Sequence, residues 1–136
     1  PPPPDFQAED GIRDGIVRLV GSEMCIRDRA WFTTAPIHAV KKLHEALGWT
    51  PDDVDLYEIN EAFACVTMAA MTDLGISHDK VNVNGGACAL GHPIGATGCR
   101  ISVTLLHALK ARNLKRGIAS QCIGGGEATA VAYELV

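Results

Sequence analysis

Apolar residues along this chain recur at two spacings, which predict helices that alternate with short strands. A spacing of three to four residues is typical of one helix face, and it predicts helices over residues 36–47, 60–74 and 95–111. Pro36 suits the first turn of the first helix, and Gly48 and Gly75 stand where glycine commonly closes a helix.

Short runs rich in β-branched and aromatic residues lie between these helices. They predict strands over 54–59, 80–84, 117–123 and 129–135. Only three glycines, 124–126, separate the last two runs, so we expect that pair to be antiparallel. Strands that alternate with helices predict an α/β fold, with a mostly parallel sheet flanked by helices.

The first 29 residues show neither spacing, and we interpret 1–29 as a disordered leader outside the domain. Four opening prolines favour polyproline II, which would suit a recognition tail. Alternatively, residues 7–29 resemble a translated sequencing adapter, because the runs QAEDGIRD and LVGSEMCIRD back-translate to common adapter sequences. On this second interpretation the protein's own sequence starts at Ala30, partway through a gene, and the domain covers 30–136.

Composition narrows the class of protein. The chain has 136 residues, of which 47% are hydrophobic, enough for one domain with a core. Its net charge is −4 and its basic residues are scattered, which argues against nucleic-acid binding. No apolar run approaches the roughly 20 residues that span a bilayer, and no signal peptide is evident, so we expect a cytoplasmic protein that binds no membrane. Five cysteines without a CxxC pair predict free thiols, with neither disulfides nor a metal site.

Polar residues follow the predicted strands at three points: Asn60, His92 and Cys122, which are 32 and 30 residues apart. Ligands of open α/β sheets bind at the carboxyl ends of strands, so the topology allows these side chains to converge. Each also has an ordinary structural interpretation. Asn60 could cap the following helix, His92 could be a loop residue satisfied by the backbone, and Cys122 could be a buried thiol. Glu61 could be a catalytic carboxylate, or it could simply be stabilised by the dipole of the helix whose first turn it occupies.

The loop around His92 is rich in glycine. Glycine lets backbone approach a ligand without a Cβ in the way, and Pro93 keeps His92 out of a regular helix. The loop matches neither a dinucleotide-binding fingerprint nor a P-loop. In the final turn, the N–H groups of Gly124 and Gly125 could form an oxyanion-binding nest beside Cys122. The cysteines at 65, 88 and 99 have no such neighbours, and we interpret them as structural.

Three motifs in this order resemble the C-terminal domain of thiolases of the acetyl-CoA acetyltransferase type. They are NEAFA from Asn60, NGGACALGHPIGATG from Asn84 and CIGGG from Cys122. The resemblance covers 32–136 and implies half of a five-layered αβαβα fold. In that family the domain would begin with a strand at the centre of the sheet, and we find no counterpart of this strand in residues 30–136. The β-prone run GIVRLV, residues 15–20, is an alternative occupant of that place.

The resemblance implies the chemistry of acyl groups carried on coenzyme A. Two acetyl-CoA molecules condense in a Claisen reaction, or a 3-ketoacyl-CoA is cleaved by CoA. His92 would activate a nucleophilic cysteine and, with a water positioned by Asn60, form one oxyanion hole. Cys122 would act as acid and base, and the N–H of Gly124 would help form a second oxyanion hole.

The resemblance also implies a substrate path lined by Phe63, near the pantetheine, and by Ala62, Gly91 and Pro93. Coenzyme A and acyl-CoA are substrates, and no further cofactor is expected. In the family the nucleophilic cysteine lies in an N-terminal domain, and no cysteine here matches it, so we expect this chain to be inactive alone. The family assembles as homodimers or homotetramers.

Two other functions stay open at this point. One is a non-catalytic thiolase-fold protein that binds acyl chains or lipid, and the other is a thiol-dependent hydrolase that uses Cys122 and His92. The full set of Asn60, His92 and Cys122 favours the thiolase. Phe32, in FTTAP, stands where many thiolases have methionine, which leaves the preferred acyl chain open.

Overall fold

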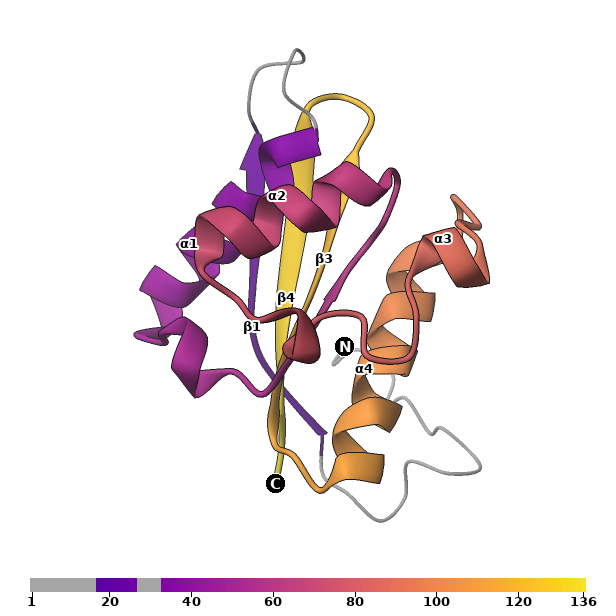
Figure 1. Cartoon of the computed structure of the whole chain (residues 1–136). Coiled ribbons are helices and arrows are strands. Elements are labelled where there is room, and N and C mark those ends of the chain that lie inside the picture. Colours follow the sequence, from indigo (N-terminus) through magenta and orange to yellow (C-terminus); the bar gives the residue numbers. More distant parts are fainter. Residues whose placement is uncertain (1–16, 27–32) are drawn as a thin grey trace, which may run out of the picture.

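The computed structural model describes residues 17–26 and 33–136 of the chain. These residues form three layers, with a four-stranded sheet between helices α1 and α2 on one face and α4 on the other (Figure 1). No helix in these two segments is long and apolar enough to cross a membrane.

The sheet is mixed, with the strand order β1-β4-β3-β2. Its strands are β1 (Val17–Ile26), β2 (Leu56–Ile59), β3 (Arg116–Ile123) and β4 (Glu127–Leu135). β2 and β3 pair in parallel, whereas β4 pairs antiparallel with both β3 and β1. Among these four strands β4 therefore runs opposite to the other three, which confirms the predicted mixed α/β sheet, although only the β2–β3 pair is parallel. The predicted antiparallel pair joined by the three glycines is also confirmed.

The helices follow the predicted spacing closely. They are α1 (Ala35–Leu47), α2 (Ala64–Leu74), α3 (Ala87–Leu90) and α4 (Thr97–Arg112), with short 3₁₀ helices η2 (Pro51–Asp53) and η3 (His78–Lys80). Gly48 and Gly75 close α1 and α2 with left-handed backbone angles, as predicted. Asn113 closes α4 in the same way, with φ of 56°.

Two predicted elements differ in the structure. The strand predicted over 80–84 is reduced to one parallel bridge between Tyr57 and Val81, because Asn82 turns the backbone to a positive φ of 49°. The helix predicted from Asn60 begins only at Ala64. Asn60 instead continues the sheet, since its backbone N–H donates to the carbonyl of Ser120 at 2.9 Å. The interpretation of Asn60 as a helix N-cap is therefore wrong.

The sheet buries an apolar layer on each face. Tyr57 and Ile59 of β2 pack in the cluster that includes α1 and α2, whereas Leu56 packs with Ile101 and Leu105 of α4. Side chains alternate along a strand, so Glu58 and Asn60 follow Leu56 onto the α4 side. This alternation places the polar groups that end β2 beside the first turn of α4.

β1 corrects the interpretation of residues 1–29 as a leader outside the domain. Val17–Ile26 pairs antiparallel with β4 at the edge of the sheet, with an irregularity between Leu19 and Gly21. A first strand is therefore present in the sheet, but it lies at the edge and not at the centre. The alternative that residues 15–20 supply this strand agrees with the structure for Val17–Val20. Residues 1–16 and 27–29 lie outside the described residues. The resemblance of 7–29 to a translated adapter stays a prediction.

Candidate active site

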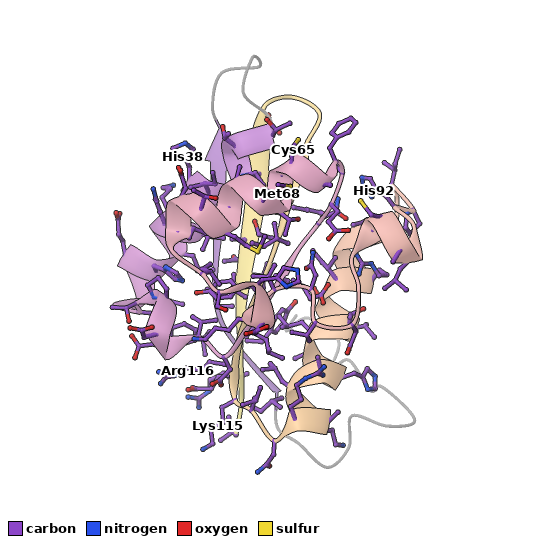
Figure 2. The ribbon with its side chains drawn as sticks, in the orientation of Figure 1. His38, Cys65, Met68, His92, Lys115 and Arg116 are labelled. Atoms are coloured by element: carbon purple, nitrogen blue, oxygen red, sulfur yellow. The ribbon has the colours of Figure 1, made fainter. Side chains whose placement is uncertain are left out.

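Asn60 and His92 meet at the carboxyl end of the parallel strands. Asn60 directly follows β2, and its side-chain Nδ2 lies 3.4 Å from Nε2 of His92. In Figure 2 His92 lies toward the end of the molecule opposite Lys115 and Arg116, from which β3 starts. The structure therefore brings these two residues together, as the topology allowed.

The loop holds His92 through its neighbours in sequence. Gly91 has φ of 91° and ψ of 161°, a combination that a residue with a Cβ adopts only with strain. On the other side of the ring, Nδ1 of His92 lies 2.6 Å from Oγ1 of Thr97, and that hydroxyl donates to the carbonyl of Pro93 at 2.9 Å. The imidazole is thus held from both nitrogens, with its outer surface exposed in this chain.

Asn60 is fully buried, and its Oδ1 has no hydrogen-bond partner among the described residues. A buried amide oxygen without a partner costs about 1–3 kcal/mol, so such atoms usually face an ordered water or a ligand. This oxygen therefore suits the water-positioning role that the resemblance implies for Asn60.

Glu61 anchors the glycine loop to the end of β2. Its carboxylate accepts from the backbone N–H of Cys88 at 2.9 Å and from Nδ2 of Asn82 at 3.1 Å. Burial alone would raise the pKa of Glu61, but these hydrogen bonds outweigh it and lower the pKa. A Cβ at Gly86 would clash with the carboxylate of Glu61, so only glycine lets the loop approach this closely. Both acceptor oxygens are engaged, which gives Glu61 a structural role.

Asn82 makes up for the strand that does not form. Its Oδ1 accepts from the N–H of Ile59 and its Nδ2 donates to the carbonyl of Ile59, both at 2.9 Å. These side-chain bonds replace the backbone ladder that a neighbouring strand would supply. Sequence reasoning missed Asn82, although an asparagine between β-prone residues is a known signal for a left-handed turn.

A buried ion pair lies beside the site. Nη1 of Arg100 lies 3.3 Å from Oε2 of Glu58, and the Glu58 side chain is only 2% exposed. Burial raises the pKa of Glu58 to about 7, although the charge of Arg100 opposes that rise. The pair joins β2, two residues before Asn60, to the first turn of α4. Neither residue was singled out from the sequence, since their pairing spans 42 positions.

Cys122 lies near the end of β3, two residues after Ser120, which pairs with Ile59. Among the described residues no hydrogen bond joins Cys122 to Asn60 or His92. Alternation along β3 puts it on the face of Ile118, which packs with α1. Burial raises the pKa of the Cys122 thiol, which keeps it protonated at neutral pH. Cys122 therefore shares this end of the sheet with the pair, and its catalytic role stays a prediction.

The remaining candidates surround the same end of the sheet. Gly124 is exposed in the turn between β3 and β4, and Gly91 and Pro93 are exposed on either side of His92. Phe63 is 58% exposed at the start of α2, and Ala62 is half-buried beside it. Their substrate-binding roles stay predictions, as does the N–H donor role of Gly124.

Two exposed apolar residues, Leu90 and Ile94, also flank His92 in the glycine loop. On α2, exposed Cys65 and Met68 lie along the helix that starts at Phe63 (Figure 2). The cysteines that the structure describes with their side chains, 65, 88, 99 and 122, are unpaired, as predicted.

Comparison with known proteins gives one consistent family. The family described as "Thiolase, C-terminal domain" matches residues 15–135. An acetyl-CoA acetyltransferase of Cupriavidus necator is 57% identical over 99 residues, which is 73% of this chain and 25% of that protein. A cytosolic acetyl-CoA acetyltransferase of Rattus norvegicus is 54% identical over 128 residues, 94% of this chain and 32% of that protein.

The fold comparison agrees. A crystal structure of the acetyl-CoA acetyltransferase of Bacillus anthracis superposes with a TM-score of 0.86 at 45% identity, over 89% of this chain and 31% of that one. This chain spans about 30% of the length of the curated relatives it matches. The match of 15–135 takes in all of β1, helices α1 to α4 and the Asn60–His92 pair. The chain therefore belongs to the thiolase family, and its described residues form the C-terminal domain of that family.

Proposed function

We propose that this chain forms the C-terminal catalytic half of an acetyl-CoA C-acyltransferase. The reaction is the Claisen condensation of two acetyl-CoA molecules or, in reverse, the cleavage of a 3-ketoacyl-CoA by CoA. The observation that carries the proposal is the contact between Asn60 and His92 at the end of the sheet, inside the motifs that identify the family. The names of the relatives, all acetyl-CoA acetyltransferases, support the same reaction class.

The geometry suits the proton transfers of this reaction. The α-proton of a thioester is weakly acidic, so its removal needs an aimed base and donors for the enolate oxygen. His92 can take a proton from a thiol at Nε2 and then return it to a thioester oxygen as a donor. The buried Oδ1 of Asn60 can hold a water that donates to the same oxygen.

Cys122 has the complementary role in this proposal. Its raised pKa favours the thiol, which can donate a proton to the substrate carbon in cleavage, and the thiolate that remains can take a proton from that carbon in condensation. The N–H of Gly124 lies in the adjacent turn and would bind the second carbonyl oxygen. The exposed side chain of Phe63, with Ala62, Gly91 and Pro93, would line the pantetheine path.

The proposal also covers the assembly. The nucleophilic cysteine that the resemblance implies matches no cysteine of this chain, so these 136 residues alone are expected to be inactive. Activity requires the other thiolase domain, in a homodimer or homotetramer. A cytoplasmic location is supported by the cytosolic relatives of Mus musculus and Rattus norvegicus. Acyl-CoA molecules are the substrates, and no further cofactor takes part.

A chimera tests this proposal. Residues 17–136 replace the matching region of the acetyl-CoA acetyltransferase of Allochromatium vinosum, which is 50% identical over 119 residues. The assay follows the thiolysis of acetoacetyl-CoA by CoA. We expect an active chimera, and we expect Asn60→Ala, His92→Ala and Cys122→Ala each to reduce kcat by about 10²–10³, the typical cost of one lost catalytic donor.

Matched controls are the exposed residues His107 and Cys99 of α4, whose alanine variants should keep the activity of the chimera. Unchanged rates in His92→Ala and Cys122→Ala would reject the catalytic assignment. A chimera that folds without activity would instead favour the non-catalytic protein that binds acyl chains or lipid.

A further inference from the structure

The geometry points to Thr97 as a positioning residue that fixes the tautomer of His92, with the proton on Nδ1 and with Nε2 left unprotonated. Thr97 is the first residue of α4 and is fully buried. Its Oγ1 lies 2.6 Å from Nδ1 of His92 and 2.9 Å from the carbonyl oxygen of Pro93. The inference rests on the proposed function, because a fixed tautomer matters only if His92 transfers protons.

Counting hydrogens on the Thr97 side gives the tautomer. A hydroxyl has one hydrogen to donate, and the carbonyl of Pro93 can only accept, so that hydrogen lies between Oγ1 and Pro93. Oγ1 is then an acceptor toward the ring, and Nδ1 of His92 must carry the hydrogen of their short contact. Neutral imidazole has one N–H, which leaves Nε2 unprotonated.

The other side of the ring is consistent with this tautomer, through a longer contact. Nε2 faces Nδ2 of Asn60 at 3.4 Å, and an amide NH₂ group can only donate. Nε2 must therefore accept, which again places the ring hydrogen on Nδ1. Two contacts on opposite ring nitrogens thus select one tautomer.

Thr97 is well placed to hold this arrangement rigidly. Because Thr97 is fully buried, its hydroxyl is shielded from solvent. In the same helix, Arg100 forms an ion pair with Glu58 of β2. That ion pair ties the first turn of α4 to the strand that carries Asn60. The Thr97 hydroxyl and the Asn60 amide, which contact the two nitrogens of the His92 ring, are therefore held at a fixed distance by the packing of α4 on β2.

The chemical consequence concerns which nitrogen exchanges protons. With Nδ1–H held by Thr97, a thiol can lose its proton only to Nε2, and the resulting imidazolium keeps Nδ1–H bonded to Oγ1. The new Nε2–H can then donate to a thioester oxygen and no longer accepts from the amide of Asn60. Without the hydroxyl, the ring can place its hydrogen on Nε2 and is then unable to act as a base there.

Nitrogen NMR on the full 136-residue chain, labelled with ¹⁵N-histidine, tests the tautomer directly. Spectra are recorded at pH 8.5, and the signals that disappear in the His92→Gln variant are assigned to His92. We expect a protonated Nδ1 and an unprotonated Nε2 in the wild type and in Thr97→Ser, which keeps the hydroxyl. Thr97→Val, of nearly the same shape, should move more than half of the His92 population to the Nε2–H form, because the amide of Asn60 can then turn its unpartnered Oδ1 to accept from Nε2–H.

The outcomes are distinct. A wild-type spectrum with Nε2–H, or a folded Thr97→Val that keeps Nδ1–H, would overturn the inference. Thr97→Ala, which also lacks the hydroxyl, gives the same reading if the valine variant does not fold.

A kinetic arm in the chimera separates this inference from the proposed function. Thr97→Val should reduce kcat at least about tenfold with little change in KM, and Thr97→Ser should restore it, because a wrong histidine tautomer disables base catalysis. Equal kcat in Thr97→Val and the wild type, in an active chimera, would overturn the positioning role. A wild type with the Nδ1–H tautomer in an inactive chimera would reject the proposed function and leave the tautomer assignment intact.

Discussion

Asn60 and His92 lie 32 positions apart in the sequence, yet the side-chain Nδ2 of Asn60 is 3.4 Å from Nε2 of His92. The contact depends on the alternation along β2, which turns Leu56, Glu58 and Asn60 toward α4. It also depends on the glycine loop, which the carboxylate of Glu61 holds against the end of the same strand. One face of a four-residue strand thus carries core packing, an ion pair and a catalytic candidate.

Asn82 should be the polar residue on which this end of the sheet most depends. Asn82→Ala removes two hydrogen bonds to the backbone of Ile59 and one to Glu61, and it leaves alanine at a positive φ. We expect the free energy of unfolding to fall by about 2–3 kcal/mol, measured by urea denaturation. Asn84→Ala is the matched control, because Asn84 accepts one exposed bond from Arg112, and it should change stability by under about 0.5 kcal/mol. Equal losses in both variants would contradict this role.

The sequence predicted the elements whose signals are local. Apolar spacing gave α1, α2 and α4 to within a few residues, and glycine marked the ends of α1 and α2, because both signals come from the geometry of single turns. The edge position of β1 could not be predicted in this way. It depends on pairing with β4, more than 100 positions away in the sequence, and not on any pattern within residues 17–26.

The site was predictable only in part, for a related reason. Asn60 and His92 were found because polar residues after strands share one edge of a parallel sheet. Thr97 and Asn82 were missed, and the anchoring role of Glu61 was not recognised, because these roles are hydrogen bonds to other loop or strand residues. Thr97 resembled an ordinary first-turn residue of a helix, and only the short distance to His92 Nδ1 gives it a function.

We expect glycine to be required at position 91, because the backbone there adopts angles that other residues reach only with strain. Gly91→Ala places a Cβ at φ of 91°, which costs about 1–3 kcal/mol or forces the loop to shift. We expect lower stability in urea denaturation and a changed chemical shift for His92. Gly95→Ala, in the same loop, is the control, because a Cβ there meets nothing within 4 Å and its φ is not in the positive range. A Gly91→Ala variant as stable as Gly95→Ala would show that this backbone angle is not needed.

Glu58 should make stability fall as the pH rises. Burial raises its pKa in the folded chain to about 7, above the ordinary value of 4.5, so the folded state binds the proton more tightly than the unfolded state. The contribution of Glu58 is therefore fully present below about pH 4.5 and is lost as the pH rises through about 7. Glu58→Gln should remove this dependence in urea midpoints measured between pH 5 and 8. Glu45→Gln, on the exposed face of α1, should keep the wild-type slope, and the same slope in Glu58→Gln would refute the assignment.

His44 should act in the opposite direction. It is buried in α1, where its Nε2 lies 3.2 Å from the hydroxyl of Tyr57, and burial lowers its pKa although the charge of Asp53 opposes the shift. The unfolded chain then binds the proton more tightly, so this contribution is present above about pH 6.5 and is lost as the pH falls below that value. His44→Gln should flatten the loss of stability on the acid side. His107→Gln, exposed on α4, should leave it unchanged, and a His44→Gln curve parallel to the wild-type curve below pH 6.5 would exclude the effect.

β1 should stabilise the domain even though it lies at the edge of the sheet. Removal of residues 1–29 takes away the antiparallel ladder along β4 and uncovers the side of α1 on which Gly21 packs. We expect a lower urea midpoint and less helical signal in far-UV circular dichroism than in the full chain. Removal of residues 1–16 alone keeps β1 whole and serves as the control. Equal helical content and equal midpoints in the full chain and in the chain that starts at Ala30 would show that β1 adds nothing.

A point variant separates the packing of β1 from its hydrogen bonds. A Cβ at Gly21 would lie 3.1 Å from Cδ1 of Leu43 and 3.2 Å from Cδ2 of Leu47, closer than ordinary van der Waals contact. Gly21→Val should therefore push the strand away from α1 and lower the urea midpoint, by about 1–3 kcal/mol in the free energy of unfolding. Ser22→Val, on the exposed neighbouring position, adds the same side chain without the clash. If both variants unfold at the wild-type midpoint, β1 is not packed on α1 in solution.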